Sequence, residues 1–149
     1  MNGVQLVIEE PAWRSYRGLQ AKLKRVAQAS AAAAKLRGGF TVLLADDARL
    51  NKLNRDFRGK DKPTNVLSFP SGAKDYHGDI AIAYGVALFE AKAAGLRFAD
   101  HASHLVVHGV LHLAGYDHET ESDAGVMEPL EVKILARMGI ADPYRRASP

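Results

Sequence analysis

Three histidines lie close together in the segment Val106–Glu119, which reads VVHGVLHLAGYDHE. They are His108, His112 and His118, in the pattern H-x3-H-x5-H. At about 100° per residue, His108 and His112 fall on one face of a helix, one turn apart, where two imidazoles can bind one ion. Continuing that helix would turn His118 roughly 240° away from His112. His118 can therefore join the pair only if the chain bends, and Gly115 can adopt the backbone angles of such a bend.

Three imidazoles around a glycine turn indicate a metal site. The chain has no cysteine, so any metal must be held by histidines or carboxylates. A tetrahedral zinc with three protein nitrogens keeps its fourth position for water, which is typical of catalytic sites. The pattern therefore predicts one Zn²⁺ per chain on His108, His112 and His118. Nickel, cobalt or copper would also accept three imidazoles.

Other histidines compete for the role of ligand. His104 and His108 are also four residues apart. His101 lies roughly 10 Å along the axis from His108, at about 1.5 Å per residue, and cannot share the ion. We expect His104 to be packed or to support a ligand, and we assign no role to His77.

The spacing also matches the ligand pattern of metzincin-type zinc peptidases, H-E-x-x-H-x-x-G-x-x-H. In metallopeptidases of the H-E-x-x-H type the glutamate accepts the proton of the attacking water, but Gly109 occupies that position here. A peptidase is therefore disfavoured. Another carboxylate, Glu119 or Asp117, or the metal alone must serve instead. We expect Asp117 to orient a metal ligand, since it neighbours His118.

Basic residues crowd a second segment, Asn54–Pro70, which reads NRDFRGKDKPTNVLSFP. The planar fork of an arginine suits phosphate, and a phosphodiester substrate needs positive charge beside its oxygens. Taken without the histidines, the segment favours a solvated loop whose charge is balanced by Asp56 and Asp61. Pro11–Ala45 likewise has seven Lys and Arg and no acidic residue, whereas Asp117–Glu131 is rich in acids, a polarity that suits a polyanionic partner.

The hydrophobic pattern predicts the elements that position these residues. Strands are expected at Val4–Ile8, Phe40–Leu44, Asn65–Phe69 and Asp79–Ala83. Helices are expected at Trp13–Leu36, at Ala48–Phe57 with Asp46 or Asp47 as cap, at Gly85–Ala94, from a cap at Asp100 to Ala114, and at Ser122–Arg137. The short link between the last two strands predicts one antiparallel pair. The fold class is α/β (α+β), with a mixed four-stranded sheet and about five helices.

Composition fits one domain over residues 1–149. The chain has 47% hydrophobic residues and a net charge of +3, without a linker or repeat. The first residues include Glu9 and Glu10 and lack the features of a signal peptide. The longest uncharged apolar stretch, Ile80–Phe89, is too short to span a bilayer. We therefore expect a cytoplasmic protein without a membrane segment.

Together, the two segments resemble the YbeY family of bacterial endoribonucleases. The family pattern H-G-x-L-H-L-x-G-Y-D-H matches His108 to His118 at every fixed position. The upstream pattern R-G-K-D-K-P-T followed by V-L-S-F matches Arg58–Thr64 and Val66–Phe69, and a GDI stretch begins at Gly78. The similarity spans roughly residues 40–139, and the long N-terminal helix matches only in kind.

The resemblance implies a three-layer zincin-like fold and a zinc ion on the three histidines. It implies cleavage of single-stranded RNA, with maturation of the 3′ end of small-subunit (16S) rRNA and ribosome quality control as the setting. The ribosome or its proteins would then be partners. The important arginine of the family falls on Arg58, which agrees with a cation facing the metal across a cleft.

Three functional hypotheses follow. The leading one is a metal-dependent endoribonuclease, in which Arg58 stabilises the phosphate. The second is a metallopeptidase-like hydrolase that uses the same site, against which Gly109 argues. The third is a ribosome-associated RNA-binding protein whose zinc is structural.

Overall fold

A computed structural model describes residues 3–116 and 121–144 of the chain. In chain order the elements are β1 (Val4–Ile8), η1 (a 3-10 helix, Pro11–Ser15), α1 (Leu19–Ala33), β2 (Gly39–Ala45), α2 (Asp47–Arg58), β3 (Val66–Pro70), β4 (Tyr76–Ala83), α3 (Tyr84–Ala94), α4 (Phe98–Leu113) and α5 (Glu121–Arg137). The order of strands and helices is the one that the hydrophobic pattern predicts.

The strands form a four-stranded mixed sheet in the order β1-β2-β4-β3. β1, β2 and β4 run parallel, and Val42 of β2 is paired with Leu6 on one side and Ile80 on the other. β3 pairs antiparallel with β4, so the predicted antiparallel pair is confirmed. β3 is consequently an edge strand, with one side unpaired in the sheet.

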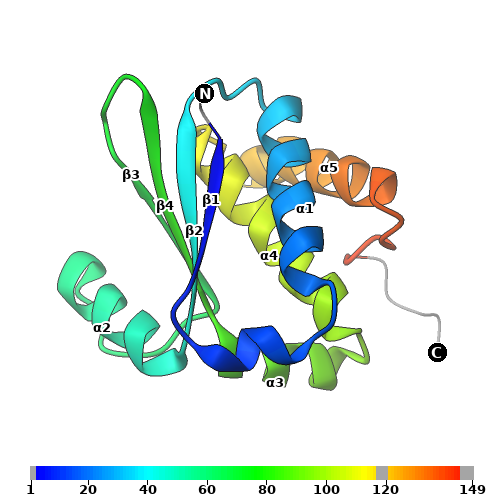
Figure 1. Cartoon of the computed structure of the whole chain (residues 1–149). Coiled ribbons are helices and arrows are strands. Elements are labelled where there is room, and N and C mark those ends of the chain that lie inside the picture. The colour runs from blue at the N-terminus through cyan, green and yellow to red at the C-terminus, as the bar shows by residue number, and fades with distance from the viewer. Residues whose placement is uncertain (1–2, 117–120, 145–149) are drawn as a thin grey trace.

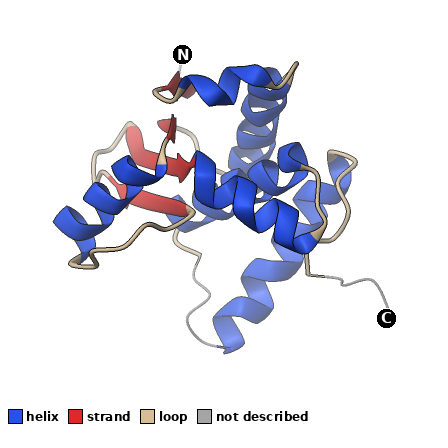
Figure 2. Ribbon diagram, turned by 90° about the horizontal axis from the view of Figure 1, so that it is seen from below, coloured by secondary structure: helices blue, strands red, loops and turns tan. Residues whose placement is uncertain are grey.

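Helices cover the two faces of the sheet unequally, which gives three layers (Figure 1). α1, α4 and α5 lie on one face, and α2 lies on the other. The main core is between the sheet and α1 and α4, with Trp13, Leu23, Val42, Ile80 and Val110 fully buried. A smaller cluster around Leu50 and Ala81 fixes α2. Seen from below in Figure 2, the strands lie between α2 and most of the other helices.

The long helix expected over Trp13–Leu36 is divided, contrary to the prediction. Pro11 begins a 3-10 helix, and α1 begins only after Gly18, whose φ of 75° is left-handed. The division lets Trp13 turn into the core, where its Nε1 donates a hydrogen bond of 3.0 Å to the Ala45 carbonyl. Helical periodicity does not distinguish this tight turn from a continuous helix, because both place Trp13 on the apolar side.

Helix caps agree with the prediction in one case and differ in another. Asp46 caps α2, accepting a hydrogen bond of 2.8 Å from the Arg49 amide. Asp100 does not cap α4, because that helix already begins at Phe98. Asp100 lies in the first turn, where a negative charge is favourable, and its carboxylate contacts the Lys22 ammonium at 3.3 Å.

Within the described residues, no helix has the length and apolar character required to cross a membrane.

Candidate metal centre

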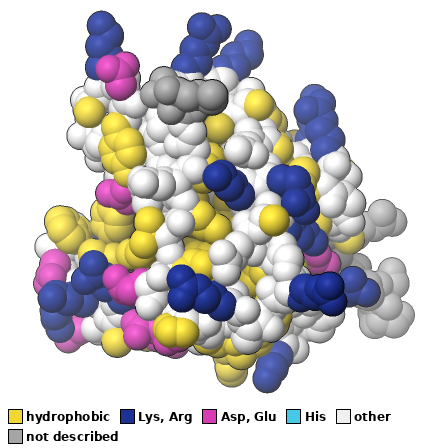
Figure 3. All heavy atoms as spheres, viewed as in Figure 1, with side chains coloured by type: hydrophobic (Ala, Val, Ile, Leu, Met, Phe, Trp, Pro, Cys, Tyr) yellow, Lys and Arg dark blue, Asp and Glu magenta, His cyan; other side chains and the backbone are white. Residues whose placement is uncertain are grey.

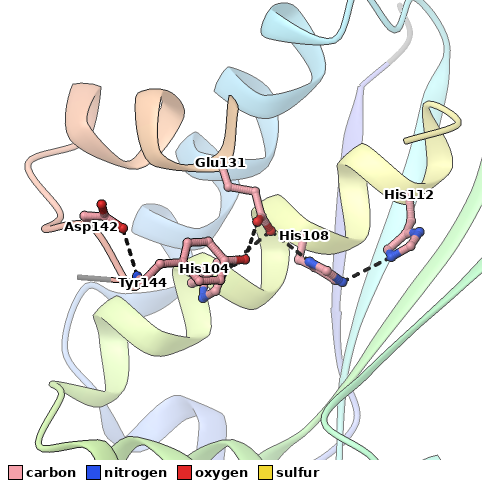
Figure 4. A network of polar contacts seen from close by, with 6 residues as sticks. All are labelled: His104, His108, His112, Glu131, Asp142 and Tyr144. Carbon is pink, nitrogen blue, oxygen red and sulfur yellow. Dashed lines mark hydrogen bonds and ion pairs between the residues drawn. The ribbon is translucent and has the colours of Figure 1, made fainter. Parts of the chain in front are cut away.

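His108 and His112 project from the same face of α4 and face each other across one turn. Their Nε2 atoms are 3.1 Å apart (Figure 4). The helix is fixed against the core, because the neighbouring residues Val107, Val110 and Leu111 are fully buried. Two imidazole nitrogens bound to one tetrahedral ion at about 2.0–2.1 Å would be separated by about 3.3 Å. The spacing of this pair therefore fits a shared metal ion.

A buried carboxylate fixes the other side of the His108 ring. Glu131 of α5 is fully buried, and its Oε2 lies 2.8 Å from His108 Nδ1. When the proton is on Nδ1 and this N–H donates a hydrogen bond to Glu131, the lone pair of the ring is on Nε2, which faces His112. A carboxylate on the second ring nitrogen is the usual support for a metal-binding histidine, because it sets the tautomer and the ring orientation.

Glu131 is the centre of a wider polar network (Figure 4). Its Oε2 also lies 3.4 Å from His104 Nε2, and the Tyr144 hydroxyl donates a hydrogen bond to its Oε1. Burial raises the pKa of Glu131, but the hydrogen bonds from His104, His108 and Tyr144 outweigh it and lower the pKa to about 2. Burial and the adjacent carboxylate raise the pKa of Tyr144. Glu131 is therefore held as a carboxylate.

The same carboxylate belongs to a second group that could hold a metal ion. Potential ligand atoms of His104, His108 and Glu131 lie within 4.8 Å of one another. In Figure 4 this group lies on the α5 side of His108, and His112 lies on the opposite side. The residues described thus offer two adjacent positions for a metal, which share His108.

Close packing explains why position 109 carries no glutamate. A Cβ atom added to Gly109 would lie 2.6 Å from Ile80 Cγ2 on β4. The backbone of α4 also contacts β3 here, since the Ser68 hydroxyl donates a hydrogen bond of 3.0 Å to the Gly109 carbonyl. Position 109 therefore faces the sheet, and a side chain there would be directed into the core.

The expected turn after the histidine pair is present. α4 ends at Leu113, and Gly115 has a left-handed φ of 99°. The Tyr116 amide donates a hydrogen bond of 3.0 Å to the Leu111 carbonyl and closes the turn. The predicted third ligand, His118, and the predicted orienting residue, Asp117, lie outside the described residues, as does Glu119.

A cleft of about 490 Å³ opens beside the pair. Its lining includes His108 and His112, the edge strand β3, and the basic side chains Arg58, Lys60 and Lys62. Arg58 is exposed at the end of α2, and its Nη2 donates a hydrogen bond of 2.8 Å to the Ser68 carbonyl. The cleft thus brings together the two segments that the sequence singled out. His104 and Glu131 are not among the residues that line it.

Glu131 and Tyr144 are parts of the site that were not predicted from the sequence. Glu131 carried a detectable signal, because it shares the helical stripe of Met127, Ile134 and Leu135, which are all buried. A lone carboxylate on such a stripe indicates a buried partner. Tyr144 carried none, since it follows the last helix in an irregular segment. His101 and His77 lie elsewhere, in contact with Glu90 (2.9 Å) and the Gly38 amide (3.0 Å).

Comparison with known proteins identifies the family to which the chain is similar. The model of the family described as "Endoribonuclease YbeY" matches residues 9–139. A relative from Maricaulis maris with that name is 44% identical, over 100% of this chain and 96% of its own length. One from Rhodopseudomonas palustris is 48% identical, over 94% of this chain and 80% of its own.

A solved structure shares the fold. The solution structure of TM1509 from Thermotoga maritima superimposes with a TM-score of 0.57 at 25% identity, covering 96% of this chain and 99% of that one. The family match begins just after β1, extends past the end of α5, and includes the histidine segment and the basic segment. The chain belongs to the YbeY endoribonuclease family.

Proposed function

We propose that this protein is a metal-dependent endoribonuclease that cuts single-stranded RNA in the cleft beside β3. The observation that carries the proposal is the cleft itself, which two facing imidazoles and three basic side chains line together. Imidazoles suit a divalent metal, and the cations suit the negative oxygens of a phosphodiester. The name of the family and of the relatives, endoribonuclease, supports the same reaction.

The metal of this proposal is one Zn²⁺ held by His108, His112 and His118. The distance of 3.1 Å between the two Nε2 atoms supports the pair as ligands. The second group, with His104 and Glu131, is the less suitable position for catalysis, because Glu131 is fully buried and does not line the cleft. When bound, such an ion would act as a Lewis acid and lower the pKa of water.

The residues of the chain have separate roles in this reaction. Arg58 would bind the non-bridging oxygens of the phosphate, with its side chain held in place by the Ser68 carbonyl. Lys60 and Lys62 would attract the RNA backbone along the cleft. Glu131 would orient His108 through Nδ1. Asp117 is proposed to orient His118.

The two alternative functions have less support. A peptidase would need a proton acceptor in place of Gly109, and the packing against Ile80 leaves no room for one. A purely structural metal would not need an adjacent cleft lined by Arg58 and two lysines. We further propose small-subunit rRNA, at its 3′ end, as the substrate and the cytoplasm as the location, with the ribosome as partner. The family resemblance supports this finer proposal.

Removal of the metal tests the activity. Wild type and His112→Ala would be purified in parallel without a histidine tag, and metal per chain and cleavage of an unstructured RNA would be measured. We expect one ion per wild-type chain, and cleavage that stops with chelator and returns with Zn²⁺. His112→Ala should have neither ion nor cleavage. Cleavage that persists after removal of the metal by chelator and in His112→Ala would disprove the proposal.

A further inference from the structure

A groove of about 650 Å³ lies on the face of the sheet that carries α2. Its floor is formed by strand residues that project from the same face, and α2 forms one wall. The lining is mostly apolar, with Leu43, Phe57 and Phe69 among its residues, and it also includes Arg49, Arg58 and Asp79. In Figure 3 hydrophobic side chains gather over the strands on this side of the molecule.

Two aromatic rings lie in this groove, one exposed and one half-buried. Phe57 is 69% exposed, and its ring meets that of Phe69 edge-on with centroids 5.5 Å apart. The guanidinium carbon of Arg58 lies 5.9 Å from the centre of the Phe69 ring. Exposure of a large apolar ring to water is unfavourable. The exposed ring of Phe57 therefore offers a surface on which another planar group can stack, next to the Arg58 cation.

The groove adjoins the proposed active-site cleft. Both are lined by Arg58, Ser68 and Pro70, because β3 is the edge strand that separates them. Successive residues of a strand project to opposite faces. Ser68 accordingly contacts α4, and Phe69 faces the groove. A chain whose phosphate is held by Arg58 therefore reaches the aromatic pair by passing the edge of β3.

We propose that Phe57 and Phe69 form a platform on which an unpaired base of the RNA substrate stacks, next to the phosphate bound by Arg58. The inference rests on the proposed endoribonuclease function and extends it to a binding subsite. Aromatic rings beside a basic track are the usual means of holding single-stranded nucleic acid, since every base has a π face. A base in a duplex is already stacked and paired, so the platform would favour single strands.

The other occupant of such a groove would be a protein. RNA is favoured because the groove shares Arg58 with the cleft, and because its lining has two cations, Arg49 and Arg58, against one carboxylate, Asp79. Arg49 also contacts the Glu9 carboxylate at 3.5 Å. An apolar protein partner would require neither cation.

Substitutions at Phe57 test the platform in the metal-loaded, full-length protein. The matched control is Phe89→Ala, because Phe89 is 72% exposed on α3 and lines neither the cleft nor the groove. Phe57→Leu keeps an apolar side chain without a π face, and Phe57→Tyr restores the ring. The readouts are kcat and KM for an unstructured RNA, and quenching of 2-aminopurine placed at successive positions of that RNA.

We expect Phe57→Ala and Phe57→Leu to raise KM between about fivefold and 150-fold with kcat almost unchanged, as for the loss of one stacked base. Phe57→Tyr and Phe89→Ala should resemble wild type. One 2-aminopurine position should be quenched by wild type and not by Phe57→Leu. The dependence of KM on salt should keep its slope in Phe57→Leu and become shallower in Lys60→Ala.

Equal KM and equal quenching in wild type and Phe57→Leu would overturn the platform and assign the groove to a protein partner. That result differs from failure of the proposed function, in which the wild-type protein itself cleaves no RNA.

Discussion

At the scale of single residues, the site depends on side chains that hold other side chains in place. The Ser68 carbonyl holds Arg58, and Glu131 holds His108. The sequence motif reveals the residues expected to touch metal or phosphate, because their types and spacing are fixed by the ion. It does not reveal their supports, because a partner from another helix, such as Glu131, can lie at any sequence distance.

Replacement of Arg58 by alanine should abolish most of the activity and leave the metal in place. Arg58 is exposed and contributes little to the core, whereas loss of a phosphate-stabilising donor typically costs on the order of a hundredfold in rate or more. The rate of cleavage, metal per chain and melting temperature would be measured together. Arg55→Ala is the control, since Arg55 is 51% exposed on the same helix and lines no part of the cleft. Activity near wild type in Arg58→Ala would mean that Arg58 is only a solvated surface residue at the end of α2.

Replacement of Glu131 by glutamine should weaken metal binding. The amide keeps the size of the side chain but is a poorer acceptor for His108 Nδ1, and loss of such support typically costs about 10–100-fold in metal affinity. Competition with a chromogenic chelator would measure the affinity for Zn²⁺. Glu128→Gln on the same helix removes the same charge without contact to the histidines, so it should bind like wild type. Unchanged affinity in Glu131→Gln would show that Glu131 is only a buried structural acid.

At the scale of elements, α4 sets the site because it packs directly on the sheet. The helical spacing of apolar residues and the position of the turn glycine predicted this helix, its histidine face and the bend at Gly115, since these follow from local geometry. They did not predict the break at Gly18 or the start of α4 at Phe98. Both depend on tertiary packing, in particular on the burial of Trp13 and Phe98, whose ring centroids are 5.3 Å apart. The order of strands was likewise not readable from the sequence.

Substitution of Gly109 by alanine should destabilise the protein although alanine favours helix. The added Cβ would meet Ile80 Cγ2 at 2.6 Å, and overpacking of this kind usually costs about 1–3 kcal/mol. We expect a net loss of up to about 2 kcal/mol in the free energy of unfolding, because alanine recovers about 1 kcal/mol of helix propensity. Denaturant titration would measure this change in the free energy of unfolding.

Gly125→Ala is the matched control for that substitution. Gly125 lies within α5, and a Cβ there would have nothing within 4 Å. It should raise the free energy of unfolding by about 0.5–1 kcal/mol. If Gly109→Ala stabilised the protein as much as Gly125→Ala, the close approach of α4 to β4 would be wrong.

At the scale of the whole molecule, the charge distribution favours a polyanion at the cleft more than the net charge of +3 indicates. Arg58, Lys60 and Lys62 face the same space as the histidine pair. Cations that neutralise phosphates release counterions, so binding weakens as salt rises.

The affinity for single-stranded RNA should therefore fall with a slope of about −2 in log K against log salt, from about −0.7 for each of three phosphate contacts. Fluorescence anisotropy between low and moderate salt gives this slope. Lys62→Ala should lower its magnitude by about 0.7, whereas Lys24→Ala, on α1, should not change it. A slope near zero would exclude a basic RNA track.

The bond between the Tyr144 hydroxyl and Glu131 also bears on how the protein is handled in the laboratory. Tyr144 lies beyond the last helix, in a region usually trimmed to obtain crystals or to attach a purification handle. Shortening the chain before this tyrosine would open a water path to an acid that is otherwise dry, and the orientation of His108 would loosen with it. A trimmed version that folds well and yet loads metal poorly is the expected symptom.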